Sequence, residues 1–338
     1  MSTADAQSEA VRVGVLGVGR IGRMHAGLLA HRVAGGALGM VYDADEQAAG
    51  EVATKLGVPA ASSAEELLGA DLDAVAICTS TDTHVDLLVA AAGAGKAIFC
   101  EKPVSLDLAH VDRALAAVQG SGVPLQIGFN RRFDPAHRFV RDAVAAGSLG
   151  SLHLVRISSR DPGPPPIPYI EVSGGIFLDM TCHDIDMARF VTGSEVVEVY
   201  ARGAVRVDPA IGTAGDLDTV VLTLRHADDC LTVIDNSRRA AYGYDQRVEA
   251  FGDLGMARSH NPPAHTATVL TADGSAGAAL PHFFVERYLP SYIHQWEAFC
   301  SYVRNGGPSP VTGADGRAPL AVGLAAWRSV REGRPVEI

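Results

Sequence analysis

Residues 11–22, VRVGVLGVGRIG, join a short apolar run to three glycines, and an amphipathic stretch, 20–33, begins within them. The run is rich in valine, which favours a β-strand, and Gly17, Gly19 and Gly22 are spaced as G-x-G-x-x-G. In a strand–turn–helix unit the first glycine permits a tight turn, the second lets the backbone approach a pyrophosphate, and the third lets helix and strand pack closely. The stretch therefore predicts a dinucleotide-binding turn, with the phosphates facing free N–H groups at the helix N-terminus.

An acid follows at the distance expected for a ribose contact. The second strand-like run, ALGMVYD, ends at Asp43, which is 43 − 22 = 21 residues beyond Gly22. A carboxylate there hydrogen-bonds the ribose 2′-hydroxyl and repels a 2′-phosphate, and no basic residue follows in DADEQ. The spacing predicts NAD rather than NADP; a structural glycine turn with a solvated Asp43 is the alternative. Arg20, inside the glycine loop, could cover the adenine or face water.

Strand-like and helix-like segments alternate up to residue 128. Strands are expected at 74–79, 97–100 and 124–129, with helices at 83–94 and 107–120. This alternation predicts a doubly wound, parallel Rossmann sheet with helices on both faces. The near-continuous apolar sequences AVAIC and AIFC fit strands that are buried on both sides.

The pattern changes after residue 128. A helix at 134–147, a strand in SLHLVRISSR and a mainly helical segment at 174–193 precede successive strand-like runs between 195 and 272. Hairpin-like spacing without helices predicts a large, mainly antiparallel open sheet. Helices at 286–304 and 315–331 are expected to close the chain.

We therefore expect an α/β protein with three parts. A disordered tail occupies residues 1–10, an NAD-binding Rossmann domain residues 11–128, and a substrate-binding and oligomerisation domain residues 129–338.

Length and composition agree with a soluble, two-domain globular protein. The 338 residues suit two domains, and 47% of them are apolar against 20% charged. The formal charge is 28 − 39 = −11 at pH 7, which disfavours nucleic acid and anionic membranes as partners and favours a neutral small molecule. The opening MSTADAQSEA lacks the features of a signal peptide, and no run of 18 apolar residues occurs, so we expect a cytoplasmic protein.

The segment GGIFLDMTCHDID, Gly174–Asp186, carries candidate reacting groups. On one helix, Asp179 and His183 would share a face because they are four residues apart. Oxidation of a secondary alcohol needs a base with a pKa near the working pH, which favours histidine, and a carboxylate one turn away can orient the imidazole. A structural histidine, a metal site with Asp186 and a nucleophilic Cys182 are the alternatives; without further ligands nearby, we predict no metal.

Polar residues also follow the third and fourth predicted strands. Residues 79–81, Thr-Ser-Thr, lie at the carboxyl edge where open α/β sheets bind ligands, although capping of the next helix also explains them. Lys102 follows AIFC and precedes Pro103, which biases the lysine toward extended geometry. A lysine that points into the cleft could donate to the reacting oxygen. An ordinary surface lysine paired with Glu101 is the alternative.

Taken together, these motifs resemble those of the Gfo/Idh/MocA oxidoreductase family. The resemblance rests on GVGRIG with Asp43, CEKP at 100–103, GFNRRFDP at 128–135 and SGGIFLDMTCHDIDMARF at 173–190. YGYDQRVEAFG at 242–252 and FFVERY at 283–288 are similar to its inositol 2-dehydrogenase branch. The family implies a Rossmann domain followed by an α/β domain with an open antiparallel sheet, commonly assembled as a homotetramer through that sheet.

The resemblance also implies site residues. The catalytic set would be Lys102, Asp179 and His183, with His183 exchanging the substrate proton. The residues expected around NAD are Gly17, Gly19, Arg20, Ile21, Gly22, Asp43, Thr79, Ser80, Thr81, His84, Glu101 and Lys102. Those expected around a polyol are Lys102, Asn130, Arg160, Tyr169, Asp179, His183, Tyr242, Tyr244 and Arg287. Ser159 stands where some inositol dehydrogenases have a histidine, which leaves the stereoisomer open.

The leading hypothesis is an NAD-dependent dehydrogenase that oxidises a ring alcohol of myo-inositol, or of a close cyclitol, to the 2-keto product in inositol catabolism. Another sugar or scyllo-inositol is the first alternative. An NAD-dependent glycosidase and a non-catalytic NAD-binding protein are the others.

Overall fold

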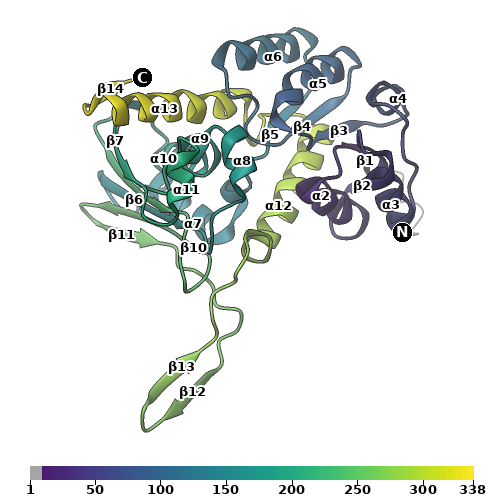
Figure 1. Cartoon of the computed structure of the whole chain (residues 1–338). Coiled ribbons are helices and arrows are strands. Elements are labelled where there is room, and N and C mark those ends of the chain that lie inside the picture. Colours follow the sequence, from purple (N-terminus) through teal and green to yellow (C-terminus); the bar gives the residue numbers. More distant parts are fainter. Residues whose placement is uncertain (1–9) are drawn as a thin grey trace. The chain divides into compact units, whose positions relative to one another are not determined.

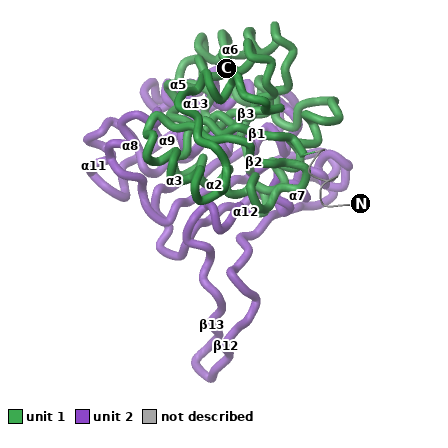
Figure 2. The backbone as a smooth tube through the Cα atoms, turned by 90° about the vertical axis from the view of Figure 1, so that its right-hand side faces the viewer, with its two compact units in different colours: residues 1–130, 290–318 green, residues 131–289, 319–338 purple. Residues whose placement is uncertain are grey.

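The computed structural model describes residues 10–338, and Figure 1 shows the order of the elements along this part of the chain. The predicted tail lies outside the described residues except for Ala10. The chain divides into two compact units (Figure 2): unit 1 comprises the described residues up to Asn130 and Pro290–Ala318, and unit 2 comprises Arg131–Leu289 and Pro319–Ile338. The sequence-based boundary lies after residue 128 and assigns 290–318 to the second domain, so the structure differs in where this segment belongs.

The sheet of unit 1 is parallel, with the order β2-β1-β3-β4-β5 in the described chain (Figure 1). Its strands are β1 (Val11–Leu16), β2 (Gly36–Tyr42), β3 (Ala74–Ile77), β4 (Ala97–Cys100) and β5 (Leu125–Ile127). Helices α2 (Arg20–His31), α3 (Glu46–Leu56), α4 (Ala64–Gly69), α5 (Thr81–Gly93) and α6 (Leu108–Ser121) connect them. Strands β3 and β4 are buried along their whole length, as their continuous apolar sequences predict. The predicted Rossmann sheet is confirmed.

Local signals in the sequence set the helix ends of unit 1. Helix α3 begins where the Asp45 side chain accepts a hydrogen bond from the Ala48 amide, and it ends at Gly57, whose φ of 70° suits glycine. Helix α6 repeats this arrangement with Asp107 and Gly122.

The larger sheet of unit 2 is mixed, with the order β11-β10-β6-β9-β8-β7-β14. Its strands are β6 (Leu152–Arg160), β7 (Val196–Ala204), β8 (Thr219–His226), β9 (Leu231–Ser237), β10 (Asp245–Gly252), β11 (Gly255–Arg258) and β14 (Val336–Glu337). The neighbours pair antiparallel, except that β6 and β9 run parallel. This confirms the predicted large, mainly antiparallel sheet.

One face of this sheet carries the core of unit 2. Alternate β8 residues Val220, Leu222 and Leu224 are buried in a cluster with residues of the helices, whereas Val221 on the other face is 48% exposed. The other elements of the described chain are η1 (Asn130–Phe133), α7 (Pro135–Ala145), α8 (Ile167–Val172), α9 (Gly175–Asp179), α10 (Thr181–Thr192) and α11 (Pro209–Thr213), with β12 (Thr268–Thr271) and β13 (Gly274–Gly277) forming a separate hairpin.

Two long helices are shared between the units. Helix α12 (Phe284–Asn305) begins in unit 2 and continues in unit 1 from Pro290, and α13 (Gly313–Glu332) begins in unit 1 and continues in unit 2 from Pro319. Both boundaries therefore fall at a proline inside a helix. Within residues 10–338, no helix is both long and apolar enough to cross a membrane.

Candidate active site

The structure gives a different reason for glycine at each of the three positions of the first turn. Gly17 has φ +88°, and a Cβ there would lie 2.7 Å from the backbone nitrogen of Thr79. A Cβ on Gly22 would lie 1.9 Å from the carbonyl oxygen of Gly17. A Cβ on Gly19 would meet no described atom within 4 Å. The first and third glycines therefore permit the turn and its packing, and the second leaves the backbone open to a ligand.

Asp43 lies beside this loop. Its Oδ2 accepts a 2.6 Å hydrogen bond from the Val18 amide, and its Oδ1 accepts one of 3.0 Å from the Asp45 amide. Helix α2 begins at the exposed Arg20, with Gly19 as its N-cap, followed by the half-buried Ile21. Because Gly19 has no side chain to bind the first amides, this N-terminus and Asp43 fit the pyrophosphate and ribose of NAD.

The end of β3 supplies the next polar group of residues. Ser80 is the N-cap of α5 but makes no side-chain capping bond, and Thr83 donates to the Thr79 hydroxyl at 2.6 Å. His84 is buried, and its ring nitrogens contact the carbonyl oxygens of Pro103 at 2.9 Å and Thr79 at 3.1 Å. Burial lowers the pKa of His84, and the bonds to these carbonyls oppose that effect. His84 is thus held by the backbone beside Lys102 and Thr79.

Glu101 and Lys102 follow β4. Glu101 is buried, with Oε1 2.8 Å from His25 Nε2, while Lys102 is half-buried and its amide donates to Glu101 Oε2 at 3.3 Å. The buried strand β4 therefore ends in a carboxylate that is engaged by the protein and a lysine that is partly accessible.

In unit 2, the segment with Asp179 and His183 forms two short helices rather than one. Asp179 ends α9, Met180 separates the helices with φ −97° and ψ −58°, and His183 lies in the first turn of α10. The spacing predicted a single helix that carries both residues, and this prediction was wrong. Both side chains are half-buried, and the Cys182 thiol is buried and donates to the Asp179 carbonyl oxygen at 3.2 Å.

Asp179 is bound by a phenol and a guanidinium. Tyr169 donates to Asp179 Oδ1 at 2.8 Å, and Arg238 Nη1 lies 3.3 Å from Oδ2. Arg238 is 1% exposed and also pairs with Asp216 at 3.3 Å. The α9 carboxylate is therefore held on both oxygens, which fixes its orientation.

Asp161 and Arg238 were not predicted from the sequence. They directly follow β6 and β9, and because these two strands run parallel, their carboxyl ends lie at the same edge of the sheet. The Asp161 amide donates to the Ser237 carbonyl at 2.9 Å. Burial raises the pKa of Asp161 to about 6, with Arg131 and Arg238 opposing and Asp179 reinforcing the shift. The sequence shows a charged residue after each of the two predicted strands, but it does not show that these strands pair with each other.

The residue after His183 anchors the start of α10. Buried Asp184 accepts hydrogen bonds from Arg131 at 2.6 Å, Ser159 at 2.6 Å and Asn236 at 2.7 Å. Burial raises the pKa of Asp184, and Arg131 opposes the shift. Ser159, at the position that left the stereoisomer open, therefore serves this internal network.

Asp186, which the alternative hypothesis placed in a metal site, forms an ion pair. Asp186 pairs with Arg132, whose Nε and Nη2 lie 2.9 Å and 2.6 Å from its oxygens. In the described part of the chain, no group of three or more histidines, cysteines or carboxylates is arranged to hold a metal ion.

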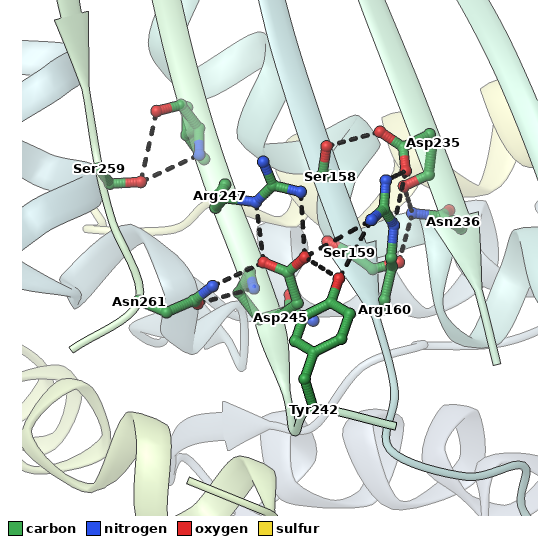
Figure 3. Close-up of polar contacts among 12 residues, drawn as sticks. Ser158, Ser159, Arg160, Asp235, Asn236, Tyr242, Asp245, Arg247, Ser259 and Asn261 are labelled. Atoms are coloured by element: carbon green, nitrogen blue, oxygen red, sulfur yellow. Dashed lines mark hydrogen bonds and ion pairs between the residues drawn. The ribbon is translucent and has the colours of Figure 1, made fainter. Parts of the chain in front are cut away.

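Two of the residues expected around a polyol lie on the other face of the sheet of unit 2 (Figure 3). Ser159 points toward α10, so the next residue along β6, Arg160, points away from it. Arg160 binds Asp235 at 2.6 Å and donates to the Tyr242 hydroxyl at 3.1 Å, and this hydroxyl donates to Asp245 at 2.7 Å. Their role as substrate contacts stays a prediction.

Three further expected contacts are buried within the units. Asn130 donates to Ser291 at 3.2 Å in unit 1. In unit 2, the Tyr244 hydroxyl accepts from Arg131 at 3.5 Å, and Arg287 pairs with Asp134 at 2.6 Å. Within unit 2, hydrogen bonds join two pairs of the expected polyol residues, Tyr169 with Asp179 and Arg160 with Tyr242. The roles of Asn130, Tyr244 and Arg287 also stay predictions.

Comparison with known proteins tests the family assignment. A family model described as "Oxidoreductase family, NAD-binding Rossmann fold" matches residues 11–129, and one described as "GFO/IDH/MocA C-terminal domain" matches residues 137–258. The chain is 47% identical to a myo-inositol 2-dehydrogenase of Thermotoga maritima, covering 97% of this chain and 98% of the relative. It is 45% identical to an inositol 2-dehydrogenase of Rhizobium meliloti, covering 97% and 99%.

Solved structures of similar proteins share the fold of this chain. A probable dehydrogenase from Thermotoga maritima superposes with a TM-score of 0.95 at 47% identity, covering 97% of this chain and 98% of that one. The scyllo-inositol dehydrogenase of Lactobacillus casei, solved with NAD(H) and scyllo-inositol, superposes with a TM-score of 0.90 at 28% identity, covering 97% and 99%.

These matches span both units and confirm the predicted family, enzyme class and cofactor. The chain belongs to the Gfo/Idh/MocA family of NAD-dependent oxidoreductases.

Proposed function

We propose that this oxidoreductase is an inositol 2-dehydrogenase that converts myo-inositol, or a close cyclitol, to its 2-keto product. The observation that carries the proposal is the half-buried pair of Asp179 and His183 in a chain that matches inositol 2-dehydrogenases over nearly its whole length. An imidazole supplies a base in the physiological range, which the removal of a hydroxyl proton requires.

The residues of the chain have distinct roles in this reaction. The glycine turn and Asp43 would hold NAD, which would supply the hydride acceptor. His183 accepts the hydroxyl proton, and Lys102 donates a hydrogen bond to the reacting oxygen and offsets its developing negative charge. Asp179, held by Tyr169 and Arg238, presents a fixed carboxylate to the substrate and to the imidazole.

A ring of hydroxyl groups needs several fixed donors and acceptors to read its stereochemistry. In unit 2, the carboxylates of Asp161 and Asp179 offer acceptors and Tyr169 offers a hydroxyl. We add Asp161 to the expected substrate contacts because this half-buried residue follows β6 at the sheet edge where Arg238, the partner of Asp179, follows β9. Assembly as a homotetramer, a cytoplasmic location and a role in inositol catabolism remain parts of the proposal.

The test is a panel of cyclitols and sugars, incubated with NAD or NADP while NADH or NADPH formation is followed. The proposal predicts the highest kcat/KM for myo-inositol with NAD, and a 2-keto product by NMR. Highest activity on a non-cyclitol sugar would contradict it. NAD binding without turnover would indicate a non-catalytic protein, and glycoside hydrolysis without net NADH would indicate a glycosidase.

A second candidate substrate is scyllo-inositol. The observation in its favour is the full-length structural match to an enzyme solved with scyllo-inositol. The same panel separates the two stereoisomers by their kcat/KM values.

A further inference from the structure

A chain of buried polar side chains leads to Glu101 from within unit 1. Trp296 of α12 donates through Nε1 to His25 Nδ1 at 2.9 Å, and His25 Nε2 lies 2.8 Å from Glu101 Oε1. His25 and Trp296 have no exposed surface, and Glu101 is 7% exposed. These contacts place an imidazole of α2 between an indole and a carboxylate.

The chemistry of the indole fixes the tautomer of this imidazole. Trp296 can only donate, so His25 Nδ1 must accept and its proton must lie on Nε2. His25 therefore donates to Glu101 as a neutral imidazole. A second proton on Nδ1 would oppose the indole N–H. Edge-to-face contacts with Phe99 and Tyr292, at centroid distances of 5.4 Å and 5.7 Å, restrict the ring further.

The carboxylate of Glu101 is fixed on its second oxygen as well. Oε2 accepts from the Lys102 amide at 3.3 Å. The backbone of Gly128 packs against the same group, because a Cβ there would lie 3.0 Å from the carboxyl carbon. Glu101 thus connects His25 to the peptide that carries Lys102.

We propose that His25 is a positioning residue for the dehydrogenase reaction, and that it acts by holding Glu101 and, through Glu101, the backbone of Lys102. This inference rests on the proposed function, in which Lys102 donates to the reacting oxygen. A carboxylate without its imidazole donor can rotate and compete for the neighbouring ammonium group. Small displacements of a reacting group lower kcat more than they lower binding.

The experiment compares two variants of similar polarity. In His25→Gln the amide nitrogen extends to about the place of Nε2 and can still donate to Glu101. In His25→Asn the shorter amide lies near Nδ1, reaches Trp296 and cannot reach Glu101. We expect His25→Asn to lower kcat by about tenfold to a hundredfold with KM values for NAD and myo-inositol within about threefold. His25→Gln should retain kcat within about threefold of wild type. Rates are normalised to active sites counted by NAD titration.

A third variant keeps the result interpretable if His25→Asn does not fold. Trp296→Phe preserves the aromatic packing but removes the indole donor, which frees His25 Nδ1 to take up a proton. Among the described residues in ring or hydrogen-bond contact with His25, Glu101 and Tyr292 are titratable. We therefore expect an additional acidic ionisation in the kcat pH profile of Trp296→Phe and its absence in wild type.

The outcomes separate the two proposals. A wild-type enzyme that forms no NADH with any cyclitol overturns the proposed function and the positioning role together. With an active wild type, full kcat in His25→Asn, equal losses in both His25 variants, or an unchanged pH profile in Trp296→Phe overturns the positioning role alone.

Discussion

Lys102 and His183 are supported by different chemistry in the two units. The residues on either side of Lys102 form hydrogen bonds with imidazoles: His25 contacts Glu101, and His84 contacts the Pro103 carbonyl. The start of α10, which carries His183, is instead held by a buried ion pair between Arg131 and Asp184.

This difference predicts different sensitivities. The imidazoles act as hydrogen-bonding groups, whereas the guanidinium always carries a charge, so the loss of each support has a different cost. Removal of one partner from a buried ion pair leaves an uncompensated charge and costs stability. Removal of a neutral donor costs less stability. Changes around Lys102 should therefore appear mainly in kcat, and changes around Asp184 mainly in the free energy of unfolding.

The largest effects are expected from the two reacting side chains themselves. Lys102→Ala and His183→Ala should each lower kcat by about 10²- to 10⁴-fold, because each removes a group that acts on the reacting oxygen or its proton. Steady-state kinetics and NAD titration measure this, and the dissociation constant for NAD should change by less than about threefold. A parallel loss of NAD affinity and kcat would assign Lys102 to cofactor binding instead.

The ion pair of unit 2 provides the next largest effect. Arg131→Met should lower the free energy of unfolding by about 3–5 kcal/mol, because Asp184 would remain buried without its cation. Urea unfolding followed by circular dichroism measures the change. The control is Arg131→Met with Asp184→Asn, which leaves no buried charge and should recover most of the loss. A single-variant loss below about 1 kcal/mol would show that the pair is not a main support.

Acid should act on the buried histidines rather than on the arginine pairs. Burial lowers the pKa of His137 in unit 2 from 6.5 to about 4, so the folded state binds fewer protons than the unfolded state between these values. Stability should fall as the pH drops from about 6.5 to about 4, by about 3 kcal/mol from this residue. Burial also lowers the pKa of His84, with the same sign.

Urea unfolding at several pH values tests this expectation in His137→Gln. Its stability should depend less steeply on pH than that of wild type over this range. An equal slope would mean that the acid sensitivity comes from groups other than His137.

Local patterns in the sequence predicted much of the fold. The three glycines, Asp43 and the alternating segments predict a Rossmann sheet because their spacing and alternation can be read directly from the sequence. The break between α9 and α10 was missed because Met180 carries no signal that ends a helix. The segment 290–318 was misassigned because an amphipathic pattern shows that a face is buried but not against which core.

The candidate site likewise contains residues that were predicted from the sequence and residues that were not. Asp179 and His183 were found because they are four residues apart in one motif. Asp161 and Arg238 were missed because the parallel pairing of β6 with β9 joins segments that are distant in sequence. Ser159 and Arg160 point to opposite faces of β6. The sequence alone does not show which of these faces packs against α10, because that depends on the neighbouring elements.

The smallest expected effect concerns Asp161, which titrates although arginines surround it. Burial raises its pKa to about 6, so it changes charge where His183 is expected to work. An ionised carboxylate accepts a stronger hydrogen bond from a ring hydroxyl than a neutral group does. KM for myo-inositol should therefore fall as the pH rises through about 6 in wild type. In Asp161→Asn this change should disappear, with KM at pH 8 raised about threefold and kcat nearly unchanged. Asp253→Asn, in an exposed turn after β10, is the matched control and should behave as wild type. If the KM profile of Asp161→Asn still follows that of wild type, Asp161 does not contact the substrate, and the acid response belongs to the other titrating groups.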